Sequence, residues 1–237
     1  MGEKKGGRIL LYYDWTYFLV LIGAALSLWA SAGVKNNFSK YSKVLTMHGI
    51  TASEAAERIL HGAGIYDVKI ERVSGNLTDH YDSSSKILRL SDSVYHSTSV
   101  AAVGVAAHEC GHAIQDYEEY VPLRLRHFLV PIVNFGNRLS MPLFVIGLLL
   151  GMYNSLVPIG IFLFSFAVLF QFVTLPVEFN ASSRAVAILG ESGMVTQEEL
   201  PKVKKVLKAA AYTYLAAAAS SALQLLRLLL LARRRRD

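Results

Sequence analysis

Three apolar regions divide the chain and predict membrane-spanning helices. Residues 15–32 carry no charged side chain, and at 1.5 Å per residue these eighteen positions cover about 27 Å, close to the hydrocarbon thickness of a bilayer. Residues 139–177 also lack any charge, over a length that suits two helices joined by a turn at residues 152–155. Residues 209–232 are rich in alanine and leucine. The pattern predicts an anchor, a helical hairpin and a further span.

Two of these segments have a second interpretation. Lys4, Lys5 and Arg8 precede the first segment, as in a cleaved secretion signal, but its length and the aromatic residues at both ends favour a retained anchor. The last segment contains Gln224 and Arg227, so an amphipathic helix in the membrane interface is its alternative. We expect a span there, because an arginine near the end of a span can extend to the headgroups.

The region between the first two apolar segments is polar and predicts a small soluble fold. Its patterns indicate a helix over 51–62, strands over 68–73 and 86–90 in a sheet of two or three strands, and a helix over 97–115. Thr51 and Glu54 have the spacing of a capping box at the start of the first helix. Ser97 or Ser99 can cap the second helix.

These elements predict a mainly α-helical membrane protein with a small β-sheet and about four transmembrane helices. We expect it in the cell membrane as a multi-pass protein. The expected segments are an N-terminal anchor (1–35), a soluble region (36–127), a transmembrane hairpin (128–177), a helix with a basic connector (178–208), and a C-terminal transmembrane helix with a basic tail (209–237).

Composition supports the membrane assignment. Hydrophobic residues make up 53% of the chain and charged residues only 18%, against roughly 25% in soluble domains, and the mean hydropathy is +0.35. Four of the positive charges behind the net charge of +6 lie in residues 233–236, which favours lipid headgroups over nucleic acid as the partner. The single cysteine, Cys110, excludes an intramolecular disulfide.

The second predicted soluble helix carries an H-E-x-x-H motif, His108-Glu109-Cys110-Gly111-His112. Because the two histidines are four residues apart, their imidazoles project from one helical face and can bind one Zn²⁺. Glu109 is rotated by about 100° from His108, so its carboxylate can reach a water activated by zinc without ligating the metal. We predict His108 and His112 as zinc ligands and Glu109 as the catalytic base.

The competing interpretation is a pair of surface histidines beside a solvated glutamate. Two observations count against it. Residues 100–107 are apolar and small, so the motif begins on a buried stretch. Gly111 costs a helix about 1 kcal/mol relative to alanine, and a close approach by another element would explain that cost. Cys110 is rotated by about 200° from His108 and should point away from the metal, as a packing residue.

A catalytic zinc needs a third protein ligand and one open position. Glu178 is our candidate, because it directly follows the predicted hairpin, which returns the chain to the side of the membrane that it left. An acidic residue at a membrane helix end, after 39 uncharged positions, indicates a functional role. Alternatively, Glu178 is only the first charged residue after the membrane span and has no part in metal binding. His127 is the weaker alternative ligand.

The reaction also needs a group that stabilises the developing oxyanion. His80 and Arg184 are the first candidates, because both lie near motif segments, and Tyr212 and Tyr214 are further ones. For each of them a purely structural role is the alternative. Metallopeptidases often bind a peptide along a sheet edge, and the strand over 86–90 is the candidate edge, with an ordinary core strand as the alternative.

Three stretches resemble one known family, residues 75–82, 105–115 and 174–182, with a weaker likeness over 209–218. The family is that of the small bacterial membrane zinc metallopeptidases of the YugP type, and the likeness covers nearly the whole chain. A more distant likeness connects it to the larger HtpX-type membrane peptidases. The resemblance implies a compact gluzincin-like domain with bound zinc, and peptide or protein substrates that include membrane proteins. It also implies a glutamate beyond a membrane hairpin, here Glu178, as the third ligand.

Two positions depart from these patterns. Asn180 stands where the family usually has an aspartate, and Ser182 stands where the HtpX-type pattern has an aspartate four residues after its glutamate. Because residue i+4 shares the helical face of Glu178, Ser182 can hydrogen-bond a ligand histidine. A serine orients the ring but raises its basicity less than a carboxylate does.

Three functions compete at this point. The first is a membrane-anchored zinc endopeptidase that acts at the membrane surface. The second is an intramembrane-cleaving zinc protease, which the polar residues Gln115, Asp116 and Glu118 directly after the motif disfavour. The third is a membrane scaffold with a structural metal, which predicts a closed site with four ligands. Basic residues flank the spans on both sides, so the side of the membrane that carries the site stays open, as does the oligomeric state.

Overall fold

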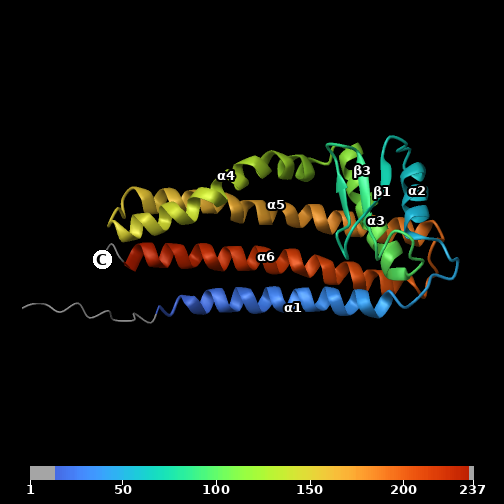
Figure 1. The fold of residues 1–237 in the computed structure, drawn as a ribbon, viewed down its shortest axis with the longest axis horizontal. Coiled ribbons are helices and arrows are strands. Elements are labelled where there is room, and N and C mark those ends of the chain that lie inside the picture. Colours follow the sequence, from blue (N-terminus) through green and yellow to red (C-terminus); the bar gives the residue numbers. More distant parts are fainter. Residues whose placement is uncertain (1–13, 235–237) are drawn as a thin grey trace, which may run out of the picture.

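A computed structural model describes residues 14–234 of the chain. These residues form six helices and three strands: α1 (Tyr17–Tyr41), α2 (Ala52–Gly62), β1 (Lys69–Val73), β2 (His80–Asp82), β3 (Ile87–Ser91), α3 (Val100–Tyr117), α4 (Val121–Leu149), α5 (Leu156–Glu191) and α6 (Leu200–Arg234). The long helices α1, α6 and α5 lie along one direction, and the sheet gathers with α2 and α3 at one end (Figure 1). The expected fold class, mainly helical with a small sheet, is confirmed.

Four of the described helices, α1, α4, α5 and α6, are long and apolar enough to cross a membrane. Many of their large apolar side chains are exposed, as those of lipid-facing helices are. Helices α4 and α5 form the predicted hairpin, whose turn contains Gly151 at a φ of 70°. Helix α6 begins at Leu200, so the basic residues that were expected in a connector lie in its first turns. The protein is a multi-pass membrane protein.

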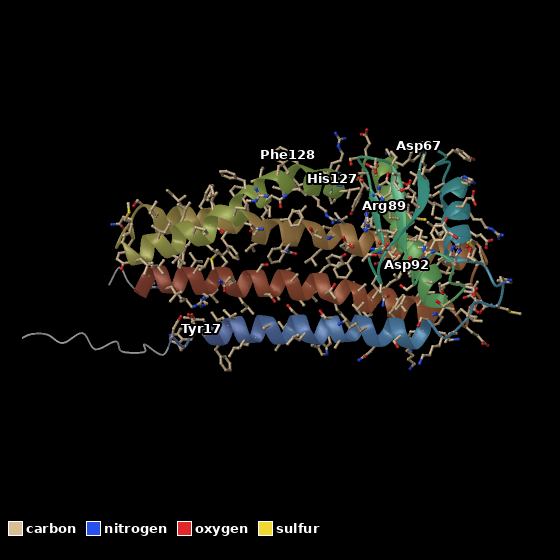
Figure 2. All side chains as sticks on the ribbon, in the orientation of Figure 1. Tyr17, Asp67, Arg89, Asp92, His127 and Phe128 are labelled. Atoms are coloured by element: carbon tan, nitrogen blue, oxygen red, sulfur yellow. The ribbon has the colours of Figure 1, made fainter. Side chains whose placement is uncertain are left out.

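Helix α1 packs antiparallel against α6. Ser220 Oγ donates to the carbonyl oxygen of Gly23 at 2.9 Å. A Cβ atom at residue 23 would lie only 3.1 Å from Ser220 Oγ. At the end of the molecule away from the sheet, Arg227 Nη2 donates to Asp14 Oδ2 at 3.2 Å, and the guanidinium lies 4.1 Å from the centre of the Tyr17 ring (Figure 2). The side chain of Arg227 therefore has partners within the protein. The sequence predicted only that it extends to the lipid headgroups. These contacts hold α1 against α6 at both levels of the bundle.

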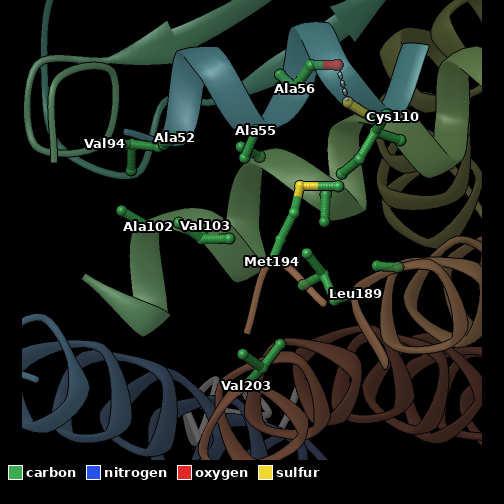
Figure 3. Close-up of a cluster of buried hydrophobic side chains, with 14 of the residues drawn as sticks. Ala52, Ala55, Ala56, Val94, Ala102, Val103, Cys110, Leu189, Met194 and Val203 are labelled. Carbon is green, nitrogen blue, oxygen red and sulfur yellow. Dashed lines mark hydrogen bonds between the residues drawn. The ribbon is translucent and has the colours of Figure 1, made fainter. Parts of the chain in front are cut away.

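The soluble end contains the predicted helix caps. Thr51 and Glu54 form the expected capping box of α2, in which each side chain accepts from the backbone N–H of the other residue. Ser99 caps α3. Both helices bury apolar faces in one core with the end of α5 and the start of α6 (Figure 3). Strand β3 also contributes to this core. In this core Cys110 Sγ lies 3.6 Å from the carbonyl oxygen of Ala56, and burial raises the pKa of its thiol, so Cys110 is a packing residue as predicted.

The sheet has the strand order β1-β3-β2, with β1 parallel and β2 antiparallel to β3. The strand predicted over 86–90 is therefore central, and its assignment as the edge that binds substrate is wrong. Its inward side chains, Leu88 and Leu90, are fully buried between neighbours. The edge beside α3 belongs to β2, where Tyr81 donates to Asp116 at 2.9 Å. With three residues, β2 is too short to show an alternating pattern.

Helix α5 continues past the residue where the hairpin was expected to end. The sequence predicted a span that ends at Val177 and a separate helix that begins at Glu178, and the structure joins the two in α5, which ends at Glu191. Pro176 removes one backbone hydrogen bond without ending the helix. The last turns of α5 enter the soluble core, where Leu189 is fully buried. This packing stabilises the helix beyond the apolar stretch.

Candidate metal centre

Helices α3 and α5 bring the three predicted ligand residues together. The Nε2 atoms of His108 and His112 are 3.2 Å apart on α3. Glu178 Oε2, from α5, lies 3.3 Å from His108 Nε2 and 3.5 Å from His112 Nε2. In the part of the chain that the structure describes, these residues form the group whose potential metal-binding atoms lie within 4.8 Å of one another. Two imidazole nitrogens and one carboxylate oxygen around a point are a ligand set for zinc.

The surroundings of Glu178 show that the site fits a cation. Its side chain is only 2% exposed, and Arg126 Nη1 donates to Oε1 at 3.0 Å. The other oxygen, Oε2, is buried without a hydrogen-bond partner among the described residues and lies beside the two imidazoles. Burying a carboxylate oxygen without a partner is costly unless it binds a cation. A divalent metal between the rings would satisfy this oxygen.

The charges around His112 also favour a cation. Burial alone would lower the pKa of His112, but the carboxylates of Glu178 and Glu109 raise it above its ordinary value. Negative charge at this position stabilises any cation that the rings hold, whether a proton or a metal ion. The electrostatics of the site therefore agree with its ligand set.

A chain of hydrogen bonds orients the ring of His112. Gln115 Nε2 donates to Val177 O at 2.8 Å and to Asn180 Oδ1 at 2.9 Å. Both amide protons are used, so Gln115 Oε1 accepts from His112 Nδ1, at 3.0 Å. The proton on Nδ1 leaves the lone pair of Nε2 for a metal. Sequence reasoning missed Gln115, although its position three residues after His112 places it on the same helical face.

The predicted contact of Ser182 is present. Ser182 Oγ lies 3.1 Å from His108 Nδ1, so each ring meets one polar side chain on the nitrogen that faces away from Glu178. Asn180, the other departure from the family pattern, accepts a hydrogen bond from Gln115, which in turn contacts the ring of His112. The chain thus orients both histidines with neutral groups.

Helices α3 and α5 approach closely at Gly111. A Cβ at residue 111 would lie 2.7 Å from the backbone oxygen of Ala181, closer than side chains come in proteins. This is the close approach that the glycine in a helix indicated. Because Gly111 precedes His112 and Ala181 follows Glu178 by one turn, the crossing sets the distance between the ligands of the two helices.

Replacing Gly111 by alanine is expected to lower both the free energy of unfolding, by about 1–3 kcal/mol, and the zinc affinity, because the added methyl meets backbone that cannot rotate away. Gly62→Ala in α2 is the matched control. Its Cβ position has open space, so the helix should gain up to about 1 kcal/mol. Denaturant unfolding measures the opposite changes in stability of the two variants, and zinc titration measures their zinc affinity. A Gly111→Ala protein as stable as the wild type would contradict the close crossing.

Glu109 stands where two cavities meet. The metal cavity, about 250 Å³, lies between α3, β2, α4 and α5 and contains Glu178 and Arg126 in its walls. The apolar cavity, about 430 Å³, lies between α1, α3, α6 and the loop after β1. His108 and Glu109 line both. A cation at the three ligand atoms is therefore accessible, in contrast to a closed structural site.

Two of the four oxyanion candidates reach the cavities. His80 lines the metal cavity from β2, with Nδ1 at 2.8 Å from Thr78 O, and Tyr214 of α6 lines both cavities. His127 lines the metal cavity from α4, at the end of the molecule that carries the sheet (Figure 2). It is not in the group of close metal-binding atoms, so the structure favours Glu178 over His127 as the third ligand.

The other two oxyanion candidates lie elsewhere. Arg184 lines neither cavity, because its guanidinium donates to Asn180 Oδ1 at 2.8 Å and to Glu118 Oε2 at 2.6 Å. These contacts suit a residue that positions Asn180, and a role of Arg184 at the oxyanion stays a prediction. Tyr212 packs against Trp29 of α1, with ring centres 5.6 Å apart.

A bundle of membrane helices that carries an H-E-x-x-H helix opposite a glutamate defines a membrane zinc metallopeptidase. Residues 16–233 match the profile of the family described as "Putative neutral zinc metallopeptidase", and the chain belongs to that family. It is 52% identical over 200 residues to the protein named "Putative membrane protease YugP" of Bacillus subtilis (strain 168), an alignment that covers 84% of this chain and 88% of that protein. No solved structure matches the chain. The family resemblance and the zinc cofactor that it implied are confirmed.

Proposed function

We propose that this zinc metallopeptidase is an endopeptidase that cleaves peptide bonds at the membrane surface. The proposal rests on the unpartnered Oε2 of Glu178, which lies beside two imidazoles at the meeting point of two cavities. In this proposal His108, His112 and Glu178 hold the zinc. Glu109 acts as the base, because it lies next to a ligand, lines both cavities and is only 8% exposed.

Zinc, when bound, supplies a Lewis acid that lowers the pKa of a water molecule and polarises a carbonyl group. Glu109 takes the proton of the attacking water and passes it to the leaving nitrogen. Gln115 and Ser182 keep the two imidazoles turned toward the metal. Arg126 holds one oxygen of Glu178 and so leaves the other for the cation.

The level of the site along the bundle supports cleavage at the membrane surface. Trp29 is 63% exposed on α1, as an aromatic residue at a bilayer interface is, and Lys35 follows as the first charged residue of that helix. Lys35 lines the apolar cavity together with His108, which supports a metal position at this boundary. Helix α3 is not among the described helices that could span a membrane, which argues against the intramembrane alternative.

The strand proposed to bind the substrate is now β2. It is an edge strand, and His80, Tyr81 and the following Ser83 line the metal cavity. A peptide that extends the sheet along β2 would pass the metal position with its backbone held by hydrogen bonds. This placement replaces the one predicted for β3.

The experiment that tests the proposal is metal removal and return. Purified protein in detergent should bind zinc and cleave casein, lose cleavage with 1,10-phenanthroline, and regain it with Zn²⁺ but not with Mg²⁺, which avoids imidazole ligands. The non-chelating isomer 1,7-phenanthroline is the control. Protein that keeps zinc yet shows no cleavage dependent on metal would support the structural scaffold instead.

A further inference from the structure

The apolar cavity differs in chemistry from the metal cavity that it joins. Its apolar walls come from α1, the loop after β1, α3 and α6, and they include Phe38, Leu77 and Ala210. Lys35 and Asp79 also line the cavity. Its volume of about 430 Å³ falls within the range of ligand pockets, about 300–1,000 Å³. A space of this size and lining suits a large apolar group.

The apolar cavity is continuous with the proposed catalytic residues. His108 and Glu109 form part of its lining and also of the lining of the metal cavity. A group in the apolar cavity therefore lies next to the bond that is cleaved when a peptide occupies the metal cavity. Two of its walls belong to the membrane helices α1 and α6, and its lining includes Lys35, the first charged residue of α1.

The loop after β1 forms one wall in an unusual conformation. Leu77 has a φ of 56°, in the left-handed region that large side chains rarely adopt. Hydrogen bonds of the two residues before Leu77 hold the loop. Gly75 N–H donates to Asp92 Oδ2 at 3.1 Å, and Ser93 Oγ donates to Asn76 Oδ1 at 2.8 Å. Strained residues of this kind concentrate at binding sites, and Leu77 is part of the cavity lining.

We propose that the apolar cavity is the specificity subsite, which takes a large apolar side chain next to the cleaved bond. The proposal rests on the peptidase function and names its substrate class, polypeptides with leucine or phenylalanine at that position in preference to alanine. Each buried methylene adds to binding of the transition state, so a larger apolar side chain raises kcat/KM.

The test compares two fluorogenic peptides that differ only in having leucine or alanine beside the cleaved bond. Wild type should prefer the leucine peptide. Ala210→Phe fills the apolar cavity and should lower the ratio of the two kcat/KM values by about 10–200-fold. Leu215→Phe, on the same helix but 47% exposed and outside both cavities, is the matched control and should leave the ratio unchanged.

A second variant has the opposite effect. Val34→Ala enlarges the cavity from α1 and should raise kcat/KM for a tryptophan peptide relative to the leucine peptide by about tenfold. Zinc content and unfolding temperature show that each variant is folded. Cleavage with the same ratios in all variants would overturn the subsite, as expected if a lipid chain fills the cavity, and leave the peptidase proposal intact. Absence of zinc-dependent cleavage in wild type would overturn both.

Discussion

Replacing Glu109 by glutamine is expected to lower kcat for peptide cleavage by about 10²–10⁴-fold while zinc stays bound. Glutamine has nearly the same shape, but its amide takes up no proton at neutral pH. The rings of His108 and His112 should keep their positions, because they contact Ser182 and Gln115 and not Glu109. Initial rates with a peptide substrate, together with metal analysis, measure both quantities.

Glu119→Gln is the matched control for the change at Glu109. Glu119 is an exposed carboxylate shortly after α3, and it pairs with Arg124 at 2.9 Å. This variant should keep the activity and zinc of the wild type, because surface ion pairs contribute little. Undiminished turnover in Glu109→Gln would remove Glu109 as the base, and loss of zinc would assign it to holding the metal.

Glu178→Gln is expected to lower zinc affinity by more than about 100-fold, beyond the 10–100-fold typical of groups that only orient a ligand. The change keeps the size of the side chain but removes its negative charge, which leaves Arg126 beside the metal without its carboxylate partner. Zinc affinity measured by competition with a chromogenic chelator tests this, and peptide cleavage should fall in parallel.

Two further variants are compared with Glu178→Gln for their loss of zinc affinity. Ser182→Ala removes only the contact with His108 and should lower zinc affinity by about 10–100-fold. Glu191→Gln, an exposed position at the end of the same helix, should bind zinc as the wild type does. If Glu178→Gln and Ser182→Ala weaken zinc equally, Glu178 supports the site from outside and does not ligate the metal.

Features that depend on neighbouring residues were predictable from the sequence. The capping box of Thr51 and Glu54, and the H-E-x-x-H spacing, each involve residues within one or two helical turns. The run of 39 uncharged positions required a hairpin, because one helix of that length exceeds the bilayer. Gly111 could be singled out because a glycine inside a helix needs a compensating contact.

Glu178 was predictable for a different reason. It is far from the histidines in sequence, but a hairpin through a membrane returns the chain to the side it left, which restricts where the next acidic residue can lie. The same reasoning treated the span and the helix that carries Glu178 as separate segments, whereas the structure joins them in α5. Burial of residues such as Leu189 in the soluble core continues α5 to Glu191, and that packing has no signature in hydropathy.

The remaining features follow from how separate elements pack, and no local pattern contains that information. Gln115 meets Asn180 across 65 residues, and Arg126 meets Glu178 across 52, because α3, α4 and α5 come together at one place. Strand β3 is central because the three-residue β2 pairs with the edge of β3 that faces away from β1. Periodicity and spacing therefore specify the helices and the metal-binding residue types. Contacts between distant segments specify how the ligand side chains are oriented, which strand forms the edge beside the metal, and where the two cavities lie. Each of these three features depends on the distances between elements.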